Sequence, residues 1–291
     1  MNSLYDFGLF LKKRAEWTNR FIERSFAFRL GIMEETITDM HLFSVADEYS
    51  DNVIVRKFNR REEGAVSGAD WLWIIGAPGS WLPLLVQAKI VNPETRVCRF
   101  LDYNKGEQRR HLVQFARQHS FIPVYCIYSY IPPLATFRKR IIDIQDTQDW
   151  ACSFVSPKTV RMLSKSGKKS QEDILAHGIP WMDPFLLLAD NQSFSGETIA
   201  RSFVAIRDHS LAFEKTNDSI TRENALKSKS SLEKRISWEN LDAIHAVQSC
   251  IPNQVCKWLT DRNYSKKVPL SGASIISSVP IKKINELKSI Q

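Results

Sequence analysis

The residues best suited to chemistry are a carboxylate, Asp70, and the tripeptide Gln87-Ala88-Lys89 that follows it along the chain. A stretch of turn residues, Gly76-Ala77-Pro78-Gly79-Ser80, separates them. A carboxylate on one strand and an oxygen donor two residues before a lysine on the next can hold a divalent metal against a scissile phosphate. The spacing therefore predicts metal-dependent hydrolysis of phosphodiester bonds.

The pattern supplies the donors that such a reaction needs. Mg²⁺ prefers hard oxygen ligands, and Asp70 offers a carboxylate while Gln87 offers an amide oxygen. Side chains two residues apart share one face of a strand, so Gln87 and Lys89 point to the same side and their apolar neighbours point to a core. We expect Lys89 to orient the attacking water and to stabilise the negative charge that develops at the phosphate.

An acidic pair, Glu34-Glu35, lies upstream in a stretch with helical spacing of apolar residues. Gln87 carries no charge where a carboxylate would be usual, which weakens metal affinity, and we expect the helix acid to compensate. The predicted metal ligands are therefore Asp70, Gln87 and Glu35. Glu34 is the alternative to Glu35.

The elements that must position these residues follow the order helix, three strands, helix, strand. Apolar residues at helical spacing predict the helices, and runs of β-branched and aromatic residues bounded by Gly, Pro or Asn predict the strands. A strand-helix-strand crossover implies a parallel pair inside a mixed sheet. The sequence thus predicts an α/β fold with a mixed central sheet flanked by helices. The expected helices span about 4–17, 26–48 and 109–119, and the expected strands span 53–58, 69–75, 81–91 and 121–128.

The C-terminal third has a weaker pattern. Residues 215–234 are rich in Ser, Lys, Asn and Glu, which predicts a flexible linker, and 238–258 reads as one amphipathic helix. We therefore assign 1–195 to the main domain and 196–291 to a C-terminal extension with a basic linker and a short helical piece.

Composition excludes several classes of protein. The 291 residues are 43% hydrophobic and 25% charged, with a net charge of +8 that favours an anionic partner. No stretch approaches the ~20 apolar residues of a membrane span, and no secretory leader is recognisable, so we expect a cytoplasmic protein without membrane contact. Five cysteines without C-x-x-C argue against a disulfide framework or a zinc ribbon. No phosphate-binding glycine loop or G-x-S-x-G motif is present.

Three motifs together resemble a known superfamily: Glu35-Thr36-Ile37-Thr38-Asp39, Ser67-Gly68-Ala69-Asp70-Trp71 and Val86-Gln87-Ala88-Lys89. With the order of elements, they resemble the PD-(D/E)XK nucleases, in the Gln-x-Lys branch around Mrr-type restriction endonucleases. They also resemble an uncharacterised bacterial family of that superfamily associated with phage-defence loci. The resemblance is good from about Glu34 to Tyr130 and covers nothing after about Asp190.

The resemblance implies a restriction-endonuclease-like core in αβββαβ order and a role for each matching residue. Asp70 would be the main metal ligand, and Gln87 would take the position usually held by a second acid. Lys89 would be the catalytic lysine, and Glu35 would be the helix acid. The preceding Pro of the superfamily pattern is absent before Asp70.

The following helix would contact the substrate. The resemblance implies that Gln108 is an auxiliary polar residue at the site, and the basic pair Arg109-Arg110 beside it is the best candidate for nucleic-acid binding. The implied function is a Mg²⁺- or Mn²⁺-dependent DNA endonuclease in anti-phage defence, with RNA as an alternative substrate. A homodimer and partner proteins from a defence operon are the expected assemblies.

Simpler interpretations stand beside this one. A catalytically inactive nucleic-acid-binding or protein-interaction subunit on the same fold is the main alternative. Asp70 could start a strand, Lys89 could be an exposed strand lysine, and Glu34-Glu35 could be a solvated helix face. Trp71, Trp73 and Trp81 could stack on bases, but such residues more often fill the core of a sheet.

Overall fold

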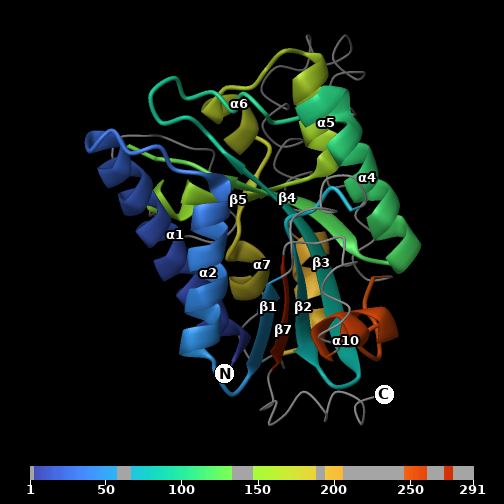
Figure 1. Ribbon diagram of the computed structural model, residues 1–291. Helices are drawn as coiled ribbons and strands as arrows, with labels where there is room; N and C mark the ends of the chain where they lie inside the picture. The colour runs from blue at the N-terminus through green and yellow to red at the C-terminus, as the bar shows by residue number, and fades with distance from the viewer. Residues whose placement is uncertain are drawn as a thin grey trace, which may run out of the picture.

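The computed structural model describes residues 3–57, 67–132, 147–187, 194–205, 246–260 and 272–277. It confirms an α/β protein in which helices flank a mixed seven-stranded sheet (Figure 1). The strands lie in the order β1-β7-β2-β3-β4-β5-β6. Their bounds are β1 Val53–Lys57, β2 Trp71–Ala77, β3 Ser80–Ile90, β4 Ile122–Tyr128, β5 Cys152–Val155, β6 Ile179–Pro180 and β7 Gly272–Ser277.

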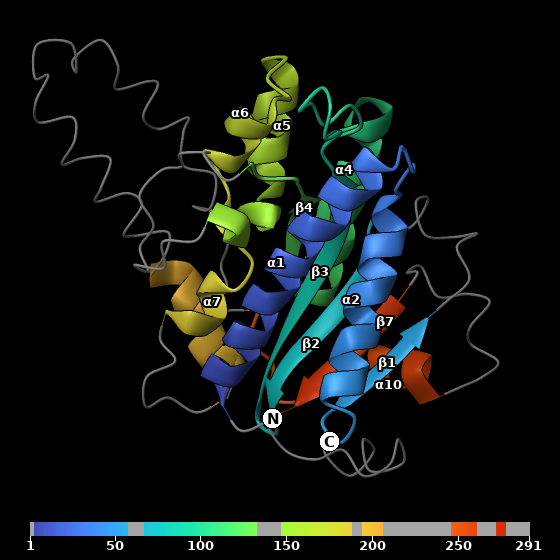
Figure 2. The ribbon, with the colours of Figure 1, turned by 90° about the vertical axis from the view of Figure 1, so that its left-hand side faces the viewer.

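Two helical layers enclose this sheet. In Figure 2, α1 and α2 lie in front of the sheet and α4 lies behind it. One apolar core joins α1, α2 and α7 to the sheet, and the other joins α4, α5 and α10 to the opposite face. The bounds are α1 Leu4–Ala27, α2 Glu34–Glu48, α4 Tyr103–His119, α5 Pro157–Lys165, α6 Gln171–Leu175, α7 Asp183–Leu186 and α10 Asn253–Thr260, with a 3₁₀ helix at Thr147–Ala151 and a helix over 196–205.

The hairpin of β2 and β3 is the centre of the molecule. These strands pair antiparallel from Trp71 opposite Val86 to Ala77 opposite Ser80. Helix α4 connects β3 to β4, and these two strands pair in parallel. The predicted parallel pair is therefore confirmed. Trp71, Trp73 and Ile75 pack in one core while Leu72 and Ile74 pack in the other, because alternate side chains of a strand face opposite sides. The preference for tryptophan in the sheet core is confirmed.

One strand comes from a region that sequence patterns placed outside the main domain. Strand β7 lies between β1 and β2, antiparallel to β1 and parallel to β2. Without it β1 would have no described partner in the sheet. The C-terminal extension predicted over 196–291 therefore contributes a strand to the interior of the sheet that the sequence analysis did not anticipate.

The predicted helices differ in extent from those observed: α1 ends at Ala27 rather than near 17, and α4 begins at Tyr103 rather than at 109. The expected helix over 26–48 is interrupted, because α1 continues to Ala27 and α2 begins only at Glu34. The turn between them has Arg29 at a positive φ of 56°, which an α-helix does not allow. The helix predicted over 238–258 was wrong for 246–252, where Gln248 forms a β-bridge with Trp81. The linker predicted over 215–234 lies outside the described residues.

Candidate active site

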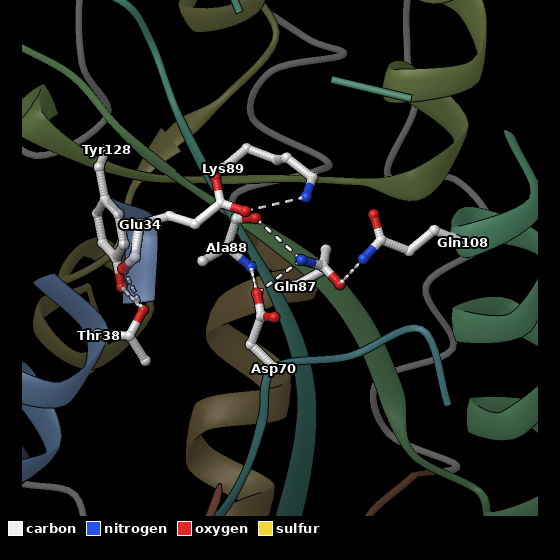
Figure 3. Close-up of polar contacts among 8 residues, drawn as sticks. All are labelled: Glu34, Thr38, Asp70, Gln87, Ala88, Lys89, Gln108 and Tyr128. Atoms are coloured by element: carbon white, nitrogen blue, oxygen red, sulfur yellow. Dashed lines mark hydrogen bonds and ion pairs between the residues drawn. The ribbon is translucent and has the colours of Figure 1, made fainter. Parts of the chain in front are cut away.

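Four of the polar residues singled out in the sequence converge at one end of the hairpin (Figure 3). Asp70 immediately precedes β2, while Gln87 and Lys89 stand near the end of β3. Glu34 is the first residue of α2, where the positive end of the helix dipole favours a carboxylate. The alternation predicted for β3 is confirmed, because Val86 and Ala88 belong to the α1–α2 core and Gln87 faces away from it toward α4.

The carboxylate of Asp70 is held firmly against β3. Its Oδ2 accepts a hydrogen bond from the backbone N–H of Ala88 at 2.5 Å and another from Nε2 of Gln87 at 2.6 Å. Its own N–H donates to the carbonyl of Val86 at 2.9 Å, which continues the antiparallel ladder beyond β2. The strand pairing that builds the hairpin therefore also fixes the orientation of the acid.

A directed chain of amide hydrogen bonds extends from this acid to α4. Gln108 Nε2 donates to Gln87 Oε1 at 2.8 Å, and Gln87 Nε2 in turn donates to Asp70 and, at 3.0 Å, to the carbonyl of Ala88. Gln87 is only 1% exposed. Oε1 of Gln108 is buried and accepts no hydrogen bond from the described residues. A buried acceptor without a donor is costly, so this atom marks an arrangement that is incomplete.

A glycine brings α4 close enough for this contact. Gly68 has a positive φ of 64°, and a Cβ there would collide with the backbone carbonyl of Gln108. Any other residue would have to push α4 away from the segment that leads into Asp70. The Gly-Ala-Asp motif thus has a structural reason for its glycine: it sets the distance between Asp70 and Gln108.

Lys89 is an almost buried cation with an acid beside it. The side chain of Lys89 is 5% exposed, and its Nζ lies 3.3 Å from Oε1 of Glu34, whose side chain is 27% exposed. Burial raises the pKa of Glu34, and the charges of Asp70 and Glu35 raise it further, while Lys89 opposes them. The carboxylates of Asp70 and Glu34 therefore interact electrostatically, so both acids belong to one site.

Helix α2 is anchored where it presents Glu34. Thr38 Oγ1 donates to the carbonyl of Glu34 at 2.9 Å and lies 3.0 Å from the hydroxyl of Tyr128 on β4. Both Thr38 and Tyr128 are buried. This pair ties the first turn of α2 to the sheet beside the site. Sequence reasoning missed both residues, although Thr38 stands one helical turn after Glu34 and so shares its face.

The remaining predicted residues are placed differently. The ion pair to Lys89 is made by Glu34, the alternative helix acid, and Glu35 follows it in the first turn of α2, only partly exposed. Arg109 lies 3.3 Å from Asp102 and its side chain is 14% exposed, so an acid of the protein already balances its charge. Arg110 is exposed and donates to the carbonyl of Lys105.

The oxygen atoms around Asp70 bear on whether a divalent cation could bind here. No group of three or more His, Cys, Asp or Glu side chains gathers as metal ligands in the described part of the chain. The site instead combines Asp70 with two neutral oxygens. Nε2 of Gln87 now sits between Oδ2 of Asp70 and the carbonyl of Ala88, which is where a cation would find two oxygens.

Exchanging oxygen and nitrogen in both amides would turn that position into an all-oxygen site. Gln87 Oε1 would then face Asp70 and Ala88, and Gln87 Nε2 would donate to Oε1 of Gln108, the buried acceptor that now lacks a donor. The exchange moves no backbone, and it places the Gln108 amide nitrogen in the buried position that the unpaired oxygen now occupies, so it creates the oxygen site without gaining a hydrogen bond. Hard oxygens are the ligands that Mg²⁺ takes, so the residues present fit such an ion.

A family model matches residues 8–278 of the chain. The chain belongs to DUF6615, a family of unknown function. No curated protein and no solved structure matches it. The DUF6615 match includes Glu34, Asp70, Gln87, Lys89 and Gln108 and ends just after β7, so the C-terminal strand falls within the family's matched region. No helix in the described part of this DUF6615 chain is both long and apolar enough to span a membrane.

Proposed function

We propose that this protein is a metal-dependent nuclease that hydrolyses phosphodiester bonds, with DNA as its substrate. The observation that carries the proposal is the nearly buried Lys89, paired with Glu34 and two residues from the Asp70–Gln87 contact. Removing an ammonium group and its acid from water costs about as much as their pairing returns, so the buried pair of Lys89 and Glu34 favours a functional role over a stabilising one. The resemblance to PD-(D/E)XK nucleases implies the same Asp70, Gln87 and Lys89, with Glu35 as the helix acid and Glu34 as its alternative.

The ligands of the metal follow from the donor set. Asp70, the amide oxygen of Gln87 and the carbonyl of Ala88 would hold the ion, which when bound polarises the phosphate and activates water. Gln108 orients the amide of Gln87 and so decides which of its atoms faces Asp70. Glu34, rather than Glu35, serves as the helix acid in this proposal because it contacts Lys89.

Lys89 acts on the reacting phosphate itself. Its ammonium group donates to the oxygen on which negative charge develops, and it orients the attacking water. Its burial provides low-dielectric surroundings, in which the interaction between this charge and the phosphate is stronger than in bulk water. Glu34 forms an ion pair with Lys89, and the Thr38–Tyr128 contact holds the first turn of α2 that carries Glu34.

Nucleic acid is the substrate that the charge of the chain favours. The net charge of +8 attracts a polyanion, and Arg110 is exposed on α4, the helix that carries Gln108. Phosphate contacts of this kind give salt-dependent affinity without sequence preference. Preference for DNA over RNA rests on the resemblance alone.

The test is cleavage of supercoiled plasmid, linear duplex, single-stranded DNA and RNA by the purified chain, with Mg²⁺, Mn²⁺ or a chelator. Asp70→Asn and Lys89→Met keep the size of each side chain while removing its charge. Lys165→Met is the matched control, because Lys165 is an exposed lysine at the end of α5. We expect metal-dependent cutting that both site variants lose and the control keeps.

The contrary results are equally specific. Cutting by Lys89→Met at the wild-type rate would refute the assignment of the site. Salt-sensitive binding of nucleic acid without any cutting, unchanged by chelator, would instead favour the inactive binding subunit.

A further inference from the structure

A groove begins where the candidate active site ends. It has a volume of about 920 Å³ and runs between the end of α1 with the turn to α2 on one side and the connection from β3 to α4 on the other. Ile90 and Val91, the two residues that follow Lys89, form part of its wall. Figure 1 shows both connections at the end of the molecule beyond β3 and β4. A chain lying in this groove would therefore pass next to Lys89.

The wall combines exposed apolar side chains with two arginines and one acid, Glu94. Phe26, Leu30 and Phe100 line the groove and are 47%, 63% and 63% exposed. Large apolar side chains that gather on a surface in this way mark a binding site. Arg29 and Arg99 stand among them, both exposed. Aromatic faces for stacking, interspersed with cations for phosphate, are the chemistry by which proteins hold unpaired nucleotides.

The groove is formed before anything binds. Asn92 Oδ1 accepts hydrogen bonds from the backbone N–H groups of Glu94 and Thr95, which closes the turn after β3. Backbone bonds from Cys98 to Lys169 and from Gln171 to Arg96 then fasten this connection to the segment that leads into α6. A preorganised wall loses little conformational entropy on binding, so the free energy of binding is reduced little by the cost of ordering it.

The rings also extend toward the site helix. Phe100 contacts Tyr103 edge to face with ring centroids 6.0 Å apart, and Tyr103, 56% exposed, begins α4. A base stacked on Phe100 would thus lie between the groove and the helix that carries Gln108.

We infer that the groove binds a single-stranded segment of nucleic acid next to the scissile phosphate, an inference that rests on the proposed nuclease function. Within a duplex the faces of the bases are covered by their neighbours and cannot stack on Phe100. The volume lies in the ~300–1,000 Å³ range of pockets that enclose organic ligands, which suits a few unpaired nucleotides. The preferred substrate is then single-stranded, or a duplex with an unpaired end or flap.

The experiment measures binding apart from cleavage. Fluorescence anisotropy in chelator would compare a labelled single-stranded DNA, the same sequence as RNA, and the blunt duplex. Phe100→Ala and Arg99→Ala test the groove, and Phe43→Ala is the matched control because Phe43 is 64% exposed on α2 and is not among the residues that line the groove. We expect tighter binding of single strands than of duplex, and a loss of about tenfold in Phe100→Ala but not in Phe43→Ala.

Two results would overturn the inference. One is equal single-strand affinity in the Phe100→Ala variant and the wild type. The other is a change of oligomeric state in Phe100→Ala, measured by light scattering, without a change in nucleic-acid binding, which would make the groove a contact between copies of the chain. The proposed function can fail separately. If Phe100→Ala binds single strands more weakly but the wild type cleaves nothing, the groove is a nucleic-acid-binding site and the protein is not a nuclease.

Discussion

Two clusters of polar side chains in the described part of the chain differ in charge and access. The first is the set around Asp70 and Lys89. The second lies between α1, α2 and β5, where His41 Nε2 is 3.0 Å from Thr18 Oγ1 and 3.7 Å from Cys152 Sγ, and Arg14 donates to His41 Nδ1. A cysteine beside a histidine is the residue pair of many nucleophilic enzymes.

The difference between the clusters is charge and access. Burial lowers the pKa of His41 well below its ordinary value and raises the pKa of Cys152 to about 12. Both groups are therefore neutral, and the thiol is no nucleophile. Around Lys89 the groups instead form an ion pair, Lys89 with Glu34, beside Asp70 at the end of the central hairpin and next to a groove. Residue types alone do not identify an active site, because burial leaves His41 and Cys152 neutral.

The largest expected effect is on cleavage. Lys89→Met should lower the rate by about 10²–10³, since it removes a cation aimed at the transition state. The cleavage rate of Cys152→Ala per folded molecule should lie within about twofold of the wild-type rate. Single-turnover rates of both variants on one substrate would measure this. A Cys152 variant that folds but does not cut would reverse the roles of the two clusters.

The second cluster should show its importance in stability. His41→Ala leaves donors of Arg14 and the hydroxyl of Thr18 without their partner in the core, and we expect a loss of about 2–4 kcal/mol of unfolding free energy. Urea denaturation measures it. Under conditions where the variant is folded, its cleavage rate per folded molecule should match wild type. A large drop in that rate at full folding would give the buried histidine a catalytic role.

A third change, at Gly68, alters the packing of α4 and through it the arrangement of the site. Gly68→Ala puts a methyl group against the carbonyl of Gln108 at a positive φ, which strains the backbone by about 1–3 kcal/mol. The relief is a shift of α4, which separates Gln108 from Gln87. We expect a smaller loss of cleavage than in Lys89→Met, with a higher Mg²⁺ concentration needed to reach half of the maximal rate. The matched control is Gly167→Ala: Gly167 also has a positive φ, but a Cβ there would meet nothing.

Local patterns predicted the hairpin at the centre of the sheet and not the strand inserted beside it. The hairpin of β2 and β3 follows from aromatic and β-branched runs around a Gly-Pro turn, and the shared face of Gln87 and Lys89 follows from the period of a strand. The insertion of β7 was not predictable in this way, because a short apolar segment at the far end of the chain does not identify its partners. Pairing over such a distance is decided by packing.

The choice between Glu34 and Glu35 shows the same limit within the site. Neighbouring residues of a helix point about 100° apart, since a turn takes 3.6 residues. The direction of each acid therefore depends on where α2 begins and how it docks, and the helix expected over 26–48 left both undetermined. The contact of Thr38 with Tyr128 settles the docking, and it is a tertiary contact.

The smallest expected effect is a shift in pH dependence. Because the pKa of Glu34 is raised above 4.5, this acid takes up a proton earlier than an ordinary carboxyl group as the pH falls. Its pair with Lys89 is then lost, so the acidic limb of the cleavage profile should lie at a higher pH than an ordinary carboxyl group would give. Glu34→Gln should cut more slowly and move that limb to lower pH. Glu48→Gln, at an exposed acid in the last turn of α2, should leave it in place.

Stability should change with pH in the opposite direction to activity. Between 4.5 and the raised pKa, the folded protein binds more protons at Glu34 than the unfolded chain does, so the contribution of Glu34 to stability is lost as the pH rises through this range. Relative to Glu34→Gln, wild type should therefore become less stable over the range in which its cleavage increases. Thermal unfolding of both proteins across this range measures the difference. A parallel rise of stability and cleavage would mean that the Lys89 pair outweighs the burial of Glu34.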